Sequence, residues 1–216
     1  MCLCIKPKNT TVIICCAGMG TRLGIGTTKA LVDICGKPLI IRQLELLSEY
    51  DDIRVVVGFD ASRVIKIIKE YRRDIMFVFN YEYMHNGPAD SLKKALLGAR
   101  EYIITIDGDT VHESKDFKKF LAFDKECIVV SDNVSKETIM AQLKNDQVIS
   151  LSKENGIFQW SGIAKIKKDK IKGEFQHTYE ILNNQLPMDS FYMNLKEINT
   201  QEDYEQAIEW FAGNVK

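Results

Sequence analysis

The chain has 216 residues, a length that suits one domain with a substantial core. Hydrophobic residues make up 45% and charged residues 27%, a balance that argues against disorder. The 29 basic and 30 acidic residues leave a net charge of −1, and no long basic run occurs. General binding to nucleic acid or to an anionic membrane is therefore not expected, and no run approaches the roughly 18 apolar residues of a membrane span.

The first half alternates between apolar runs and helix-period segments. Strands are predicted over 11–17, 53–59, 75–80, 102–109 and 127–132, and helices over 37–50, 61–73, 89–101 and 113–123, with Pro38 as a first helical residue. Such alternation indicates an α/β fold with a doubly wound, mostly parallel sheet.

After about residue 135 the pattern becomes more antiparallel. Two strands around an Asn-Asp turn are predicted over 138–153, then a strand over 156–167, a helix over 169–184, a strand over 191–198 and a helix over 200–213 that Thr200 caps. No linker separates the halves, so residues 1–216 are expected to form a single domain with a small antiparallel subregion.

The N-terminal segment, the cysteines and the histidines bear on the cellular compartment and on metal binding. The N-terminal segment MCLCIKPKNT is too short and too polar for a signal peptide, so a cytoplasmic protein is expected. The six cysteines include no C-x-x-C pair, and the three histidines lack metal-ligand spacing. Neither structural zinc nor disulfides are predicted.

A glycine-rich loop, AGMGTRLGIGTTKAL, follows the first strand. A dinucleotide fingerprint requires a third glycine where Leu23 stands and an acidic residue where Gly58 ends the second strand. A Walker A loop requires G-K-[ST], but Ala30 follows Lys29. Both common nucleotide loops fail, which disfavours an NAD(P)-dependent oxidoreductase.

The residues present nevertheless suit a triphosphate. Gly18 and Gly20 allow backbone N–H groups to approach phosphate oxygens, Arg22 offers a bidentate grip, and Lys29 adds a point charge. Neutralising and aligning phosphates is most of what phosphoryl-type transfer requires.

This loop, with the following GKPLIIRQLELL, resembles the nucleotidyltransferase superfamily that activates sugar phosphates and phospho-alcohols, whose signature is A-G-x-G-T-R-x…P-K-x-L. Thr28 stands where proline is common, and the spacer before Lys29 is short. The resemblance implies that Arg22 and Lys29 are catalytic. It implies a nucleotide-binding part over about 10–135, an acceptor-binding part over about 136–216, and a Rossmann-like nucleotidyltransferase fold. The loop residues implied to bind nucleotide are Ala17, Gly18, Met19, Gly20 and Thr21.

An acidic turn, ITIDGDT, ends the fourth predicted strand. Carboxylates at such a strand end lie where open α/β sheets bind ligands, and oxygen ligands suit Mg²⁺. The resemblance assigns a metal-binding role to Asp109, with Asp107 as a second acid and Asn199 in place of the aspartate of the family's E-[IV]-D-T-x-E-D segment. Mg²⁺ is therefore the expected cofactor. An ordinary helix-capping turn is the alternative.

Two further segments bear on the substrates. VFNYEYMHNGPADSL is similar to a stretch of phosphocholine cytidylyltransferase-like enzymes and implies nucleotide contacts by Asn80, Asn86, Gly87 and Ala89, a plain loop being the alternative. FQWSGIAKI is similar to the acceptor segment of the same group. Trp160 is a candidate for cation–π contact with an acceptor or else a core residue, and Asp189 and Tyr192 are placed in the acceptor pocket.

The implied reaction is Mg²⁺-dependent transfer of a nucleoside monophosphate, with CTP favoured, to a phosphocholine-like phospho-alcohol or a sugar phosphate. Pyrophosphate is released, and the product is an activated precursor for a surface glycan or lipid. An ionised phosphate nucleophile needs no general base, which fits a chain without a Ser-His-Asp constellation. A sugar-1-phosphate uridylyl-, guanylyl- or thymidylyltransferase and an inactive nucleotide-binding regulator are the alternatives, and a homodimer stays open.

Overall fold

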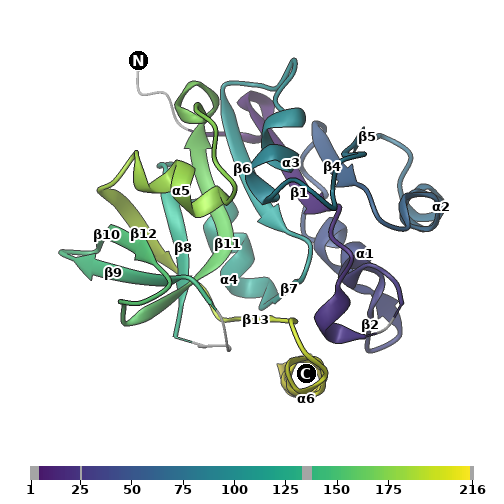
Figure 1. The fold of residues 1–216 in the computed structure, drawn as a ribbon. Coiled ribbons are helices and arrows are strands. Elements are labelled where there is room, and N and C mark those ends of the chain that lie inside the picture. Colours follow the sequence, from purple (N-terminus) through teal and green to yellow (C-terminus); the bar gives the residue numbers. More distant parts are fainter. Residues whose placement is uncertain (1–4, 25, 133–137, 215–216) are drawn as a thin grey trace.

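A nine-stranded sheet forms the centre of the molecule (Figure 1). The computed structural model describes residues 5–24, 26–132 and 138–214. In chain order the strands are β1 (Thr10–Cys16), β4 (Ile53–Val57), β5 (Ile75–Phe79), β6 (Tyr102–Asp107), β8 (Cys127–Ser131), β9 (Met140–Lys144), β10 (Gln147–Ser152), β11 (Phe158–Lys167) and β12 (Met188–Tyr192). They lie side by side in the order β5-β4-β1-β6-β11-β8-β12-β10-β9.

The direction of the strands divides this sheet. The neighbours β5, β4, β1 and β6 run parallel, and β12 runs parallel to β8. β11 is antiparallel to both β6 and β8, and β9 and β10 form a hairpin whose turn residues Asn145 and Asp146 both have positive φ. The predicted α/β class with an antiparallel subregion is confirmed, and the carboxyl ends of the parallel strands meet at one edge.

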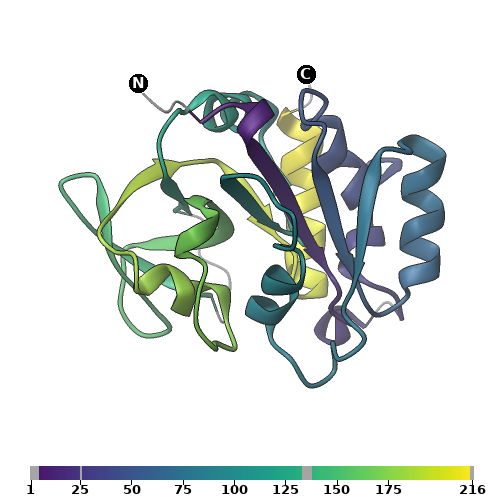
Figure 2. The same cartoon turned by 90° about the horizontal axis from the view of Figure 1, so that it is seen from above.

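Helices cover both faces of the sheet (Figure 2). On one face α1 (Leu39–Glu45), α2 (Ala61–Tyr71) and α4 (Ser114–Ala122) pack on strand residues that include Ile14, Val55 and Ile106. On the other, α3 (Pro88–Lys94) and α5 (Thr178–Asn183) pack on residues that include Ile13 and Val56. Successive strand residues thus point to opposite faces, as the strand period requires.

Small elements complete the fold around α6 (Gln201–Asn214). β7 (Thr110–His112) pairs with β13 (Leu195–Glu197), and β2 (Asp33–Ile34) pairs with β3 (Lys37–Pro38). Short 3₁₀ turns occupy Pro7–Asn9, Thr21–Leu23, Lys29–Leu31 and Lys168–Lys170. As predicted, Thr200 caps α6: its Oγ1 accepts the Asp203 N–H, and the Asp203 carboxylate accepts the Thr200 N–H.

Several predicted elements are wrong in detail. The helices predicted over 37–50 and 89–101 end at Glu45 and Lys94. Pro38 ends β3 and precedes the first helical residue, Leu39. The helix predicted over 169–184 is α-helical only in α5, because Gly173 at φ +96° breaks the segment between the 3₁₀ turn at Lys168–Lys170 and α5. The strand predicted over 191–198 is divided: β12 ends at Tyr192, and the chain leaves the large sheet so that β13 can pair with β7.

Two further findings concern the cysteines and the lengths of the helices. Cys15, Cys16, Cys35 and Cys127 are free thiols, whereas Cys2, Cys4 and the expected boundary near 135–136 lie outside the described residues. None of the helices in the described parts of the chain is both long and apolar enough to cross a membrane.

Candidate active site at the carboxyl edge of the sheet

The glycine-rich loop folds back on itself after β1. Gly20 has φ +60°, a backbone conformation that favours glycine, and a Cβ on it would lie 3.1 Å from Lys29 Cγ. The Thr28 hydroxyl donates to the Cys16 carbonyl oxygen at 3.3 Å and ties the returning arm to the end of β1. Lys29 is thereby brought beside the start of the loop. Ile25, within the short spacer, lies outside the described residues.

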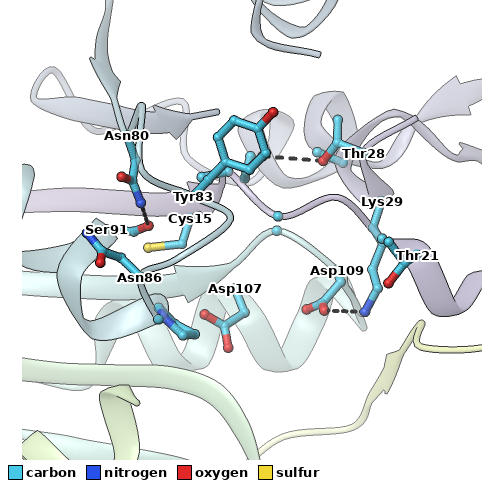
Figure 3. Close-up of a pocket in the computed structure, with 18 of the residues that line it drawn as sticks. Cys15, Thr21, Thr28, Lys29, Asn80, Tyr83, Asn86, Ser91, Asp107 and Asp109 are labelled. Atoms are coloured by element: carbon cyan, nitrogen blue, oxygen red, sulfur yellow. Dashed lines mark hydrogen bonds and ion pairs between the residues drawn. The ribbon is translucent and has the colours of Figure 1, made fainter. Parts of the chain in front are cut away.

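Two cations of this loop meet the acidic turn and the C-terminal segment. Lys29 Nζ lies 3.0 Å from Asp109 Oδ2 (Figure 3). It also donates to Asn199 Oδ1 at 2.5 Å. Arg22 Nη2 donates to the same Asn199 oxygen at 3.0 Å. The structure therefore brings together four residues predicted from three distant segments.

Glu197 of β13 fixes the amide of Asn199. It is not among the site residues predicted from the sequence. Asn199 Nδ2 donates to Glu197 Oε1 at 2.6 Å, and Gln159 Nε2 donates to Glu197 Oε2 at 2.5 Å. The Asn199 carbonyl oxygen is consequently the atom that faces Arg22 and Lys29. Glu197 corresponds to the glutamate of the family's E-[IV]-D-T segment, and this match was the signal from which its role could have been predicted.

Negative charge accumulates at the end of β6. Burial, followed by the nearby Asp109 and Glu197 carboxylates, raises the pKa of Asp107 well above its usual range. Burial, followed by Asp109, raises the pKa of Glu197 to about 7. Gly162 makes room for this cluster, since a Cβ on it would lie 2.3 Å from Asp107 Oδ2.

The first cavity, of about 370 Å³, lies between the glycine loop, the acidic turn and the segment before α3. Tyr83 and Ser91 also line it, and the Ser91 hydroxyl accepts an Asn80 Nδ2 hydrogen bond of 2.9 Å. Met19 and Ala89 do not line it; Met19 is exposed, and Ala89 is a buried residue in the first turn of α3. The predicted residues around it are Ala17, Gly18, Gly20, Thr21, Arg22, Lys29, Asn80, Asn86, Gly87, Asp107 and Asp109.

Gly87 is constrained by protein on one side. A Cβ on it would lie 1.8 Å from the Gln176 carbonyl oxygen, which also accepts the Ala89 N–H at 3.3 Å. The segment before α5 thus rests on the start of α3, and only glycine permits that approach.

A second cavity, of about 700 Å³, adjoins the first and shares Arg22, Pro88, Asp107 and Asp109 with it. Trp160 lines it, with its indole N–H donating to the Ile163 carbonyl oxygen at 3.3 Å. The other residues around it are Thr110, Thr138, Ile139, Lys153, Ser161, Gly162, His177, Thr178, Tyr179 and Glu197. The wall combines aromatic rings with acidic groups.

Two predicted acceptor residues lie apart from this cavity. Asp189, at the start of β12, accepts a Gln147 amide hydrogen bond of 3.3 Å and lies 3.5 Å from Lys125 Nζ. Tyr192 is 49% exposed, and its ring centroid lies 6.4 Å from that of Phe158. Neither residue is among those that line the two cavities.

The side-chain oxygens at the place where the two cavities meet fit a hard divalent cation. Asp107, Asp109 and the Asn199 carbonyl oxygen belong to the class of ligands that Mg²⁺ takes, and Mg²⁺ uses one or two carboxylates and completes its shell with water and phosphate oxygens. Within the described ranges no cluster of three or more His, Cys, Asp or Glu side chains is arranged to hold a metal ion. These oxygen donors suit a cation that phosphate oxygens of a substrate would also hold.

Comparison with known proteins places these features in context. The family model of the MobA-like NTP transferase domain matches residues 12–150, more than half of the chain. The bifunctional protein GlmU of Wolinella succinogenes is 31% identical over 120 residues, 52% of this chain and 26% of that protein. The 3-deoxy-manno-octulosonate cytidylyltransferase of Aliivibrio fischeri (strain MJ11) is 33% identical over 100 residues, 46% of this chain and 39% of that protein. The chain thus spans well under half of either relative.

Solved structures match along nearly the whole chain. The inositol-1-phosphate CTP transferase from T. maritima gives a TM-score of 0.78 at 16% identity and covers 95% of this chain and 96% of its own. The CTP:phosphocholine cytidylyltransferase from Streptococcus pneumoniae gives 0.74 at 23% identity and covers 94% and 99%. At these identities the likeness establishes the fold, a Rossmann-like nucleotidyltransferase architecture.

Proposed function

Because the chain belongs to the family of MobA-like NTP transferase domains, we propose that it transfers a nucleoside monophosphate from a nucleoside triphosphate to a phosphorylated small acceptor. The observation that carries this proposal is the junction of the two cavities. Arg22, Asp107 and Asp109 line both of them, so a triphosphate in one and an acceptor in the other would meet at these three side chains.

The reaction is a single displacement at phosphorus. An acceptor phosphate oxygen attacks the α-phosphorus, a new P–O bond forms, and the bond to the β-phosphate breaks with its electron pair leaving on pyrophosphate. No general base is needed because the acceptor phosphate is already ionised at neutral pH.

The chain's own cations would stabilise the charge that develops. Lys29 Nζ is held by Asp109 and Asn199 at the rim of the first cavity, and Arg22 is held by Asn199 beside the second. Both are thus fixed before substrate binds, which lowers the reorganisation needed in the transition state. Asp107, Asp109 and Asn199 would hold Mg²⁺, which when bound supplies Lewis-acid polarisation of phosphate oxygens.

We assign CTP and a phospho-alcohol with a cationic head as the preferred substrates. Trp160, His177 and Tyr179 line the second cavity together with Glu197, and aromatic faces near an acidic group suit a quaternary or primary ammonium. The cytidylyltransferase relative and the two solved structures described above are also named for cytidylyl or CTP transfer. Such a product would be an activated precursor for a surface glycan or lipid.

Pyrophosphate release tests the proposal directly. The protein is incubated with Mg²⁺ and each of the four ribonucleoside triphosphates or dTTP, in combination with phosphocholine, other phospho-alcohols and sugar 1-phosphates. We expect release with CTP and a cationic phospho-alcohol. Release only with a sugar 1-phosphate and UTP, GTP or dTTP would replace our substrate assignment, and nucleotide binding without release from any pair would identify an inactive regulator.

A further inference from the structure

Gln43 is a polar residue in the buried face of α1. It is 1% exposed, and Leu39, Ile40 and Leu44 of the same helix are buried around it. Its Nε2 donates to the carbonyl oxygens of Asp107 and Thr110, each at 3.0 Å. One amide group therefore joins the two ends of the turn that carries Asp109.

Thr110 and His112 extend this connection on the other side of the turn. The Thr110 hydroxyl donates to the Asp107 carbonyl oxygen at 3.0 Å and lies 2.8 Å from His112 Nε2. Since the hydroxyl proton is used on Asp107, His112 must donate through Nε2–H. The geometry thus assigns the Nε2–H tautomer to a histidine that is 4% exposed.

The arrangement costs stability. Gln43 Oε1 and His112 Nδ1 are buried and have no hydrogen-bond partner in the described part of the chain. Leaving a buried polar atom unpaired is unfavourable, so an apolar side chain at position 43 would serve the core at least as well. What an apolar side chain could not do is hold the two carbonyl groups of the turn.

We propose that Gln43, through Thr110 and His112, is a positioning residue that fixes the 107–110 turn and so sets the placement of the Asp107 and Asp109 carboxylates. Gln43 lines neither cavity, so it would contact no substrate. The expected effect of Gln43 on the Mg²⁺ requirement rests on the proposed function, whereas its expected effect on the turn does not depend on activity.

Gln43→Met tests it, with Lys165→Met as the matched control. Lys165 is also fully buried, and its Nζ likewise donates to backbone carbonyl groups, those of Phe120, Leu121 and Phe123 at the end of α4. Both variants lose a buried donor, but only one loses it at the acidic turn. We expect the Mg²⁺ concentration for half-maximal pyrophosphate release to rise about 10- to 100-fold in Gln43→Met and to change less than about twofold in Lys165→Met.

Amide hydrogen exchange supplies a measurement without turnover. The Gly108 N–H donates to the Cys15 carbonyl oxygen, and the Ile198 N–H donates to that of Asp109. Both amides should exchange faster in Gln43→Met than in Lys165→Met at equal global stability. Thr110→Val removes the hydroxyl of Thr110, and Thr110→Ser keeps it. Only Thr110→Val should reproduce the faster exchange of the Gly108 and Ile198 amides.

The outcomes separate the two proposals. Equal Mg²⁺ requirement and equal exchange in Gln43→Met and wild type would overturn the positioning role, as would an Nδ1–H tautomer of His112 in ¹⁵N NMR spectra. A wild-type protein that releases no pyrophosphate with any substrate pair would overturn the proposed function, and faster exchange at Gly108 and Ile198 in Gln43→Met would still support the positioning role.

Discussion

At the scale of single residues, the ion pair between Lys29 and Asp109 gives the first prediction. Lys29→Ala removes the charge nearest the acidic turn, and Asp109→Ala removes a proposed metal ligand, so each should lower turnover by about 10²–10³-fold while the fold is retained. Lys37→Ala is the control, because Lys37 is exposed and pairs only with Glu45 among the described residues. Near-normal pyrophosphate release in either site variant would remove that residue from the mechanism.

His112 gives a prediction on pH. Burial lowers the pKa of His112 to about 3 from its usual 6.5. As the pH falls from 6.5, the unfolded chain takes up this proton and the native state does not, so the free energy of unfolding should fall by up to about 1.4 kcal/mol per pH unit. Urea unfolding between pH 7 and 5 should show a shallower pH dependence for His112→Gln than for wild type. The exposed His85 is the control position, and a His85→Gln variant with the same shallow slope would contradict the assignment.

At the scale of elements, the contact between the segment before α5 and the start of α3 is tested at Gly87. Gly87→Ala would place a Cβ 1.8 Å from the Gln176 carbonyl oxygen, so that segment must move. We expect a loss of about 1–3 kcal/mol in the free energy of unfolding and a higher KM for the acceptor, since Thr178 and Tyr179 line the second cavity.

Gly213→Ala is the matched control for that variant. Gly213 lies in α6, and a Cβ on it would have no neighbour within 4 Å. Alanine should stabilise this helix by up to about 1 kcal/mol and leave KM unchanged. Comparable losses in the two variants would show that Gly87 is not specifically constrained.

Elements with a strong local pattern were predictable from the sequence. The strands β4, β6 and β8 and the helix α2 lie within the predicted ranges, and β1 begins one residue before its predicted range. The divided strand after β12 was not, because pairing of β13 with β7 depends on residues some 80 positions away. Gly173 carried a local signal for the break before α5, but the apolar spacing around it masked that signal.

At the scale of the whole molecule, the site unites segments that the sequence keeps apart. Motif residues such as Arg22, Lys29 and Asp109 were predictable because phosphate and metal chemistry dictates their type. Glu197 and Gln43 were not, because their roles come from tertiary hydrogen bonds to Asn199 and to the 107–110 turn. Acceptor residues were the hardest to predict: Trp160 of β11 lines the second cavity, whereas Asp189 and Tyr192 belong to β12, on the far side of β8, and line neither cavity.

The central claim is that the junction of the two cavities joins a nucleotide to a phosphorylated acceptor. The most direct measurement is a one-pot competition with CTP, UTP, GTP, ATP and dTTP, Mg²⁺ and phosphocholine, with the product identified by mass and pyrophosphate counted against it. We predict a CMP–acceptor diphosphate and pyrophosphate in equal amounts. The same assay is repeated with other phosphorylated acceptors in place of phosphocholine. The central claim would be contradicted if the products were orthophosphate and a nucleoside diphosphate and no acceptor carried a nucleotide.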